Sequence, residues 1–121
     1  MSKLLSIIIV VSDPAVRDAL HFYLTASGFT AYPWQDCRTP PSSNHVVDSR
    51  CVILDHRLPT LDGTDVVEGL RREGNHVPAI LLVEGITKEL ERRAAGIGAC
   101  KLLELPLLGT ILREAIDEIA V

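Results

Sequence analysis

The chain has 121 residues, of which 47% are hydrophobic and 23% are charged, and its formal net charge is −4. This length suits one domain, residues 1–121, with a single hydrophobic core. The mild negative charge argues against direct nucleic-acid binding, which needs clustered Lys and Arg. Three cysteines without a CxxC spacing argue against a disulfide framework or a zinc site.

The first predicted element is a strand over residues 7–11, an apolar run that resembles the core of a signal peptide. Asp13-Pro14 follows it in place of a small-residue cleavage site. No apolar run reaches the ~20 residues that are needed to span a bilayer. We therefore expect a cytoplasmic protein without a membrane segment.

A helix is predicted after this strand, because Asp13 can cap it and Pro14 suits its first position. Apolar residues recur at the helical period until Gly28, and a second strand is expected over residues 29–32. Prolines then interrupt the segment in which a second helix should form. We expect that helix to be short or broken.

The remaining elements alternate in the same way. Strands are predicted over residues 51–54, 79–83 and 102–105. Helices are predicted around Val66–Leu70 and over residues 88–95, and a last helix carries an apolar stripe of Leu108, Leu112, Ala115, Ile116 and Ile119. Alternating strands and helices with right-handed crossovers give an α/β, flavodoxin-like three-layer sandwich, with a five-stranded parallel sheet and about five helices.

The most informative segment surrounds Asp55, which ends a buried apolar strand and is followed by a turn through Pro59 and Gly63. Such a carboxylate lies at the carboxyl edge of the sheet, where open α/β folds keep their chemistry. The whole chain resembles the receiver (CheY-like) domain of two-component response regulators. The resemblance identifies Asp55 as the position of the phosphoacceptor, and Pro59 and Gly63 as the turn after it.

Other positions depart from the pattern of this family, which implies an acidic pair for Mg²⁺, a hydroxyl and a lysine around the phosphoryl group, and an aromatic switch residue. The acidic pair falls on Val11 and Ser12, or, shifted by one residue, on Ser12 and Asp13. Asp13 is then either a weak metal ligand beside Asp55 or a helix cap. The hydroxyl, aromatic and lysine positions hold Val83, Leu102 and Leu105. We expect their apolar side chains to raise the pKa of Asp55.

These substitutions lead to the interpretation that the chain is an atypical receiver with a degenerate phosphorylation site. It is then no enzyme, and it regulates an output, such as transcription, through protein–protein contacts, with no cofactor. The resemblance is strongest to receivers of helix-turn-helix transcription regulators. An alternative is a working receiver that a histidine kinase phosphorylates on Asp55, with a weakened Mg²⁺ site. A small flavodoxin-like enzyme would need a glycine loop after the first strand, and Ser12-Asp13-Pro14-Ala15 lacks one.

The resemblance also implies partners and local geometry. We expect a sensor histidine kinase or another signalling protein as the partner, and a homodimer through the face of the fourth helix, fifth strand and fifth helix. The peptide bond before Pro106 is expected to be cis. His56 either tunes Asp55 or is an ordinary surface histidine. Charges expected on the dimer face are Lys88, Glu89, Glu91, Arg92, Arg93, Lys101, Glu114, Asp117 and Glu118.

Overall fold

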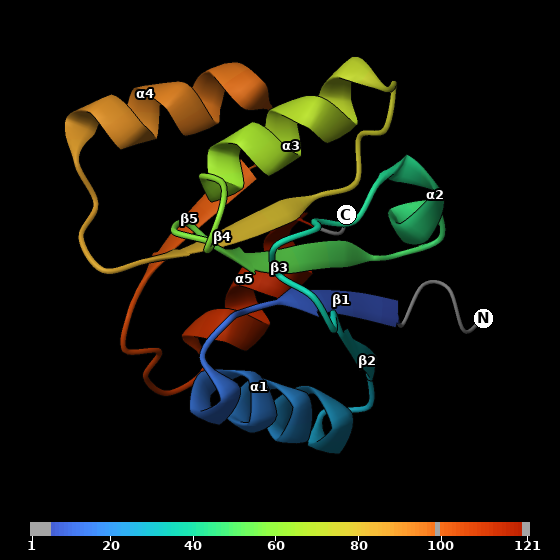
Figure 1. Cartoon of the computed structure of the whole chain (residues 1–121). Helices are drawn as coiled ribbons and strands as arrows, with labels where there is room; N and C mark the ends of the chain where they lie inside the picture. The colour runs from blue at the N-terminus through green and yellow to red at the C-terminus, as the bar shows by residue number, and fades with distance from the viewer. Residues whose placement is uncertain (1–5, 99, 120–121) are drawn as a thin grey trace.

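The protein is a three-layer α/β sandwich around one parallel sheet, as the computed structural model of residues 6–98 and 100–119 shows (Figure 1). The sheet has the strand order β2-β1-β3-β4-β5, and every pairing is parallel. This confirms the predicted fold class. The strands are β1 (Ser6–Val10), β2 (Thr30–Pro33), β3 (Cys51–Asp55), β4 (Ala79–Val83) and β5 (Cys100–Glu104).

Helices cover both faces of the sheet. The chain forms α1 (Pro14–Ala26), α2 (Ser43–Val46), α3 (Gly63–Arg72), α4 (Lys88–Ile97) and α5 (Ile111–Ile119). In Figure 1, α1 and α5 lie below the sheet, whereas α3 and α4 lie above it. The second helix has only one turn, which confirms the expectation from the prolines in that segment. Among the described helices, none is long and apolar enough to cross a membrane.

Each face of the sheet contributes side chains to a separate core. Ile7, Ile9 and Ile53 point toward α1 and α5, where they pack with Leu24 and Ile116. The alternate residues of the same strands point to the other face, where Val10, Val52, Leu54, Leu81 and Val67 are buried together. Because both faces are covered, β3 and β4 read as continuous apolar runs rather than alternating ones.

Several boundaries differ from the sequence prediction by one or two residues, and two differences change where a named leucine lies. Leu108 was assigned to the stripe of the last helix, but α5 begins at Ile111 and Leu108 is 71% exposed. Between them, Gly109 has a left-handed backbone conformation, with φ of 58°, which does not continue a helix. The fifth strand ends at Glu104, so Leu105 belongs to the following loop.

Candidate functional site

Asp55 is the last residue of β3, a central strand between β1 and β4, and its side chain is half-buried. The loop after β1 reaches this carboxylate. The Ser12 backbone N–H donates to Asp55 Oδ2 at 3.0 Å, and the Ser12 hydroxyl donates to the same oxygen at 3.3 Å. Ser12, one of the positions expected for the acidic pair, therefore contacts Asp55 through hydrogen bonds.

The pKa of Asp55 is raised above its ordinary value. Burial is the main cause, because it disfavours the charged form. The two Ser12 hydrogen bonds oppose it, and the negative charge of Asp13 adds to it. The predicted direction of the shift is confirmed. Asp55 therefore holds its proton to a higher pH than an ordinary aspartate.

Asp13 caps α1, which is one of the two roles predicted for it. Its Oδ1 accepts a hydrogen bond from the Ala15 backbone N–H at 2.9 Å, and Pro14 is the first helical residue. Val11, the other candidate for the acidic pair, is fully buried in the core on the α1 side. Asp13 is nevertheless near enough for its charge to raise the pKa of Asp55.

Mg²⁺ is usually held by one or two carboxylates together with several waters, and Asp55 and Asp13 are the carboxylates at this edge of the sheet. Asp55 Oδ2 already accepts two hydrogen bonds, and Asp13 Oδ1 serves the helix cap. Within residues 6–98 and 100–119, no three His, Cys, Asp or Glu side chains are grouped so that they could hold a metal ion. The site thus offers two carboxylates, and one oxygen of each already accepts hydrogen bonds from the protein.

The hydroxyl and lysine positions follow β4 and β5 at the same edge of the sheet. Val83 ends β4, fully buried in the core above the sheet, and its carbonyl accepts the Leu105 N–H at 2.8 Å. Leu105 packs instead against the core on the α1 and α5 side, and the bond to Pro106 is cis, as predicted. Leu102, at the aromatic position, is half-buried against the core above the sheet. Hydrocarbon side chains cannot donate hydrogen bonds to a phosphoryl group.

The turn after Asp55 is held by its own contacts. The Gly63 N–H donates to the His56 carbonyl at 2.6 Å, and a Cβ at Gly63 would overlap the Asp55 carbonyl and the Leu81 side chain. Only glycine allows this approach. Pro59 lies on the exposed outer part of the same turn. The predicted turn residues therefore lie where the resemblance placed them.

Asp62 lies in this turn, and the sequence analysis did not predict its role as a helix cap. It caps α3 by accepting from the Thr64 N–H and hydroxyl, and its Oδ2 lies 3.2 Å from His56 Nε2. Burial would raise the pKa of Asp62, but the Thr64 hydrogen bonds, with His56 and Arg93, lower it overall. His56 thus contacts Asp62 rather than Asp55. The sequence did carry a signal, since an Asp before Gly-Thr is a typical helix start.

Cys37 is a second neighbour that the sequence did not reveal. It is buried in the core above the sheet, and burial raises the pKa of its thiol, with the Asp55 charge as the next contribution. Cys37 comes from the irregular segment after β2, and no local pattern predicts where such a segment packs.

Comparison with known proteins gives a consistent family match. The profile of the response regulator receiver domain matches residues 7–117. The transcriptional regulatory protein FixJ of Bradyrhizobium diazoefficiens is 27% identical over 100 residues, which cover 83% of this chain and 49% of FixJ. The alkaline phosphatase synthesis transcriptional regulatory protein SphR of Synechococcus elongatus is 33% identical over 109 residues, covering 82% of this chain and 42% of SphR. The chain thus spans about half the length, or less, of these relatives.

Solved structures agree. The crystal structure of FixJ-N superposes with a TM-score of 0.80 at 25% identity, covering 95% of this chain and 92% of that one. The Vibrio cholerae chemotaxis protein CheY4 has a TM-score of 0.80 at 17% identity, with 94% and 97% covered, which shows the shared fold alone.

Proposed function

The chain belongs to the family of response regulator receiver domains, and we propose that it is an atypical member, which acts through protein contacts without Mg²⁺-dependent phosphorylation of Asp55. Receiver domains are signalling modules, and the relatives of this chain are transcriptional regulators. Control of transcription is therefore the output that we propose, in a cytoplasmic protein. The partner is a sensor histidine kinase or another signalling protein.

One observation carries the proposal, namely the set of groups around Asp55. Phosphoryl transfer depends on positive charges and hydrogen-bond donors aimed at the phosphoryl oxygens, and on a divalent metal ion. This chain has Ser12 against the carboxylate, and Val83 and Leu105 where a hydroxyl and a lysine would act. None of the three can supply a metal-binding carboxylate or a positive charge.

A second observation supports the alternative, a receiver that is still phosphorylated. Asp55 is only half-buried, and Asp13 is close enough to influence it electrostatically. Asp13 and backbone carbonyls would then hold a weakened metal site. The two candidates differ in Mg²⁺ affinity and in the product formed with a small phosphodonor.

Calorimetric Mg²⁺ titration and mass spectrometry after incubation with acetyl phosphate and Mg²⁺ separate these candidates. We expect the wild type to bind Mg²⁺ no better than Asp13→Asn does, and to remain unmodified. The triple variant Ser12→Asp/Val83→Thr/Leu105→Lys restores the missing groups, so we expect it to gain an acyl phosphate that Asp55→Asn removes. A stoichiometric acyl phosphate at Asp55 of the wild type would establish the alternative instead.

A further inference from the structure

A cavity of about 350 Å³ lies between the edge strand β2 and the segment that contains α2. Tyr32 and Trp34 line it from the end of β2, and His45 and Asp48 line it from the α2 segment. Asp55 is not among the lining residues. The volume is within the range of small-molecule sites, about 300 to 1,000 Å³.

Aromatic side chains are concentrated in this cavity. The chain has only two Phe, two Tyr and one Trp, and one Tyr and the Trp line the cavity together with the His45 ring. Tyr32 is 53% exposed, and Val47, which lines the same cavity, is 68% exposed. The Tyr32 ring is therefore accessible to a ligand that enters the cavity.

Two of the rings are held in place by hydrogen bonds. The Trp34 Nε1–H donates to the Thr39 carbonyl at 2.7 Å. His45 Nδ1 accepts the Ser42 backbone N–H at 3.0 Å, so in this contact the ring is neutral and carries its proton on Nε2. The Trp34 and His45 rings meet edge to face, with centroids 4.7 Å apart and planes at 70°. These walls are formed before a ligand binds, which lowers the entropic cost of binding.

The charge of the lining favours a cation. Asp48 is the one acidic side chain among the described residues that line the cavity, and no Lys or Arg is among them. Aromatic faces attract cations through their quadrupole, and a carboxylate adds an opposite charge. The formal net charge of the chain, −4, acts in the same direction. An anion would be repelled by these groups.

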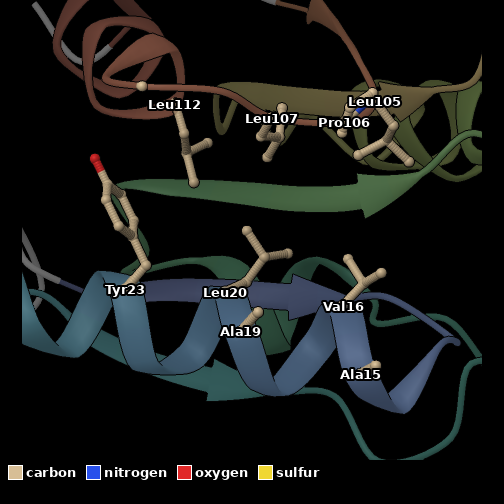
Figure 2. Close-up of a pocket in the computed structure, with 10 residues that line it drawn as sticks. Ala15, Val16, Ala19, Leu20, Tyr23, Leu105, Pro106, Leu107 and Leu112 are labelled. Carbon is tan, nitrogen blue, oxygen red and sulfur yellow. The ribbon is translucent and has the colours of Figure 1, made fainter.

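A second cavity provides a contrast within the same molecule. It has a volume of about 570 Å³ and lies between α1 and the loop from β5 into α5, with Val16, Ala19 and Leu105 among its walls (Figure 2). Tyr23 is the one aromatic side chain among the described residues that line it, and none of these residues is acidic. A cation that binds through several rings and a carboxylate should therefore distinguish the two cavities.

Apolar side chains restrict the kind of cation, because Ile8, Pro33 and Val47 also line the cavity beside β2. A bare ammonium group is strongly hydrated and would lose water against these side chains without full compensation. A methylated ammonium group instead buries its methyl groups against hydrocarbon. Aromatic cages recognise quaternary ammonium groups in this way.

We propose that the cavity beside β2 binds a small quaternary ammonium compound, with its methyl groups against Tyr32 and Trp34 and its charge near Asp48. The inference goes beyond the proposed function, because binding here does not involve Asp55. A second copy of the chain is the competing occupant, since β2 is an edge strand. However, Pro33 has no N–H to donate to an added strand, and a symmetric contact through this face would bring two Asp48 carboxylates toward each other.

The test compares choline with its neutral carbon isostere, 3,3-dimethyl-1-butanol, because the two share a shape and differ in charge. Trp34 is the only tryptophan of the chain, so its indole N–H gives a single resonance in ¹H–¹⁵N NMR titrations. We expect choline to shift this resonance and the amides of Tyr32 and Asp48, and to leave those of Val16 and Ala19 unchanged. The neutral alcohol should bind at least about tenfold more weakly.

Ethanolamine carries the same charge as choline but no methyl groups, so it should also bind more weakly, by about fivefold. Equal affinities for choline and the neutral alcohol would contradict a cation site. Equal affinities for choline and ethanolamine would contradict the preference for a quaternary ammonium group. Choline shifts at Val16 and Ala19 without any at Trp34 would place the ligand in the other cavity and overturn the proposal.

Two exposed positions of the cavity allow matched variants. Tyr32→Leu removes the ring and keeps an apolar side chain, and Asp48→Asn removes the charge and keeps the shape. Each should weaken choline binding about three- to fivefold. Phe22→Leu and Asp18→Asn make similar changes at exposed positions of α1, outside the cavity, and should leave the affinity unchanged. Circular dichroism checks that each variant folds, and unchanged affinity in either cavity variant would overturn the assigned contacts.

Sedimentation without choline tests the competing occupant. A self-association that Tyr32→Leu abolishes and Phe22→Leu preserves, together with no choline binding, would overturn the proposal. Phosphorylation by acetyl phosphate is scored separately. Wild-type phosphorylation would contradict the proposed function, while choline binding would still establish the cavity as a ligand site.

Discussion

At the scale of single residues, the site is defined by how Ser12, Asp13 and Asp55 share their hydrogen bonds. Ser12 gives both of its donors to one oxygen of Asp55, and Asp13 gives an oxygen to the first turn of α1. One carboxylate oxygen of Asp55 is therefore bound by Ser12, and one of Asp13 is bound by the first turn of α1. Ser12 partly offsets the cost of burying the Asp55 charge, and Asp13 adds to that cost.

The pKa of Asp55 should respond to its two neighbours in opposite directions. Ser12→Ala removes the hydroxyl donor that favours the carboxylate, so we expect the pKa to rise further. Asp13→Asn keeps the helix cap but removes a negative charge, so the pKa should fall. Titration of the ¹³C carboxyl resonance measures both, and Ser27→Ala, at the far end of α1, is the control. A shift of the same sign in both variants would contradict the assigned contacts.

The raised pKa of Asp55 also makes stability depend on pH. The folded state binds this proton more tightly than the unfolded state, so the resulting stabilisation is present below about pH 3.8 and is lost as the pH rises through the folded pKa. Asp55→Asn should remove this decline from urea unfolding measured across that window. Asp62 has a lowered pKa, so its stabilisation is lost as the pH falls, and Asp62→Asn should change the profile in the opposite sense. Identical profiles for wild type and Asp55→Asn would refute the assignment.

At the scale of the elements, the sequence predicts most where local chemistry decides the structure. Asp13-Pro14 predicts the start of α1 correctly, and the apolar run 79–83 coincides with β4. Boundaries that depend on tertiary packing were less predictable. Leu108 fits the apolar period of the last helix, yet the turn at Gly109 leaves it in solvent. Periodicity cannot show this, because it registers spacing and not backbone direction.

The contribution of the α1 cap to the free energy of unfolding can be measured separately from the effect of the Asp13 charge. Asp13→Ala leaves the Ala15 N–H without its side-chain acceptor, so we expect a loss of about 0.5 to 2 kcal/mol in the free energy of unfolding. Asp13→Asn retains an acceptor and should lose less than half of that amount. Asp18→Ala, an exposed α1 position outside the cap, controls for a carboxylate removed from this helix. Urea unfolding compares the variants, and equal losses for Ala and Asn would show that the charge, not the cap, matters.

At the scale of the whole molecule, the chain has the five-stranded parallel sheet of its family and carries Ser12, Val83 and Leu105 at or just after the carboxyl ends of its strands. The sequence predicts the sandwich because its apolar runs form two cores, and these place Asp55, Val83 and Leu105 at one edge of the sheet. It could not predict the cavity beside α1 or the approach of Cys37, since both depend on how loops pack. Charge alone also did not predict the partners of Arg93, one of the residues expected on the dimer face. Its guanidinium is bound to Asp65 and Glu68 of α3.

The last prediction concerns self-association through the face of α4, β5 and α5. Leu102 is packed against the core above the sheet and has no polar end, so it cannot act as the aromatic switch does in the family. The face should therefore keep one conformation. Lys101 and Glu118 bridge β5 and α5 at 3.1 Å, while Arg92 is exposed and has no ion pair with the described residues. Exposed charges on such a face set register and partner choice.

We expect sedimentation to show an association that weakens with salt and several-fold in Arg92→Glu, but not in Arg72→Glu, which changes an exposed arginine of α3. Acetyl phosphate should leave the mass distribution unchanged, because neither Val83 nor Leu105 can hydrogen-bond a phosphoryl group. A phosphodonor-dependent change in mass that Asp55→Asn abolishes would show that Asp55 is still connected to this face. In that case the domain would be a working receiver whose missing groups are replaced by others.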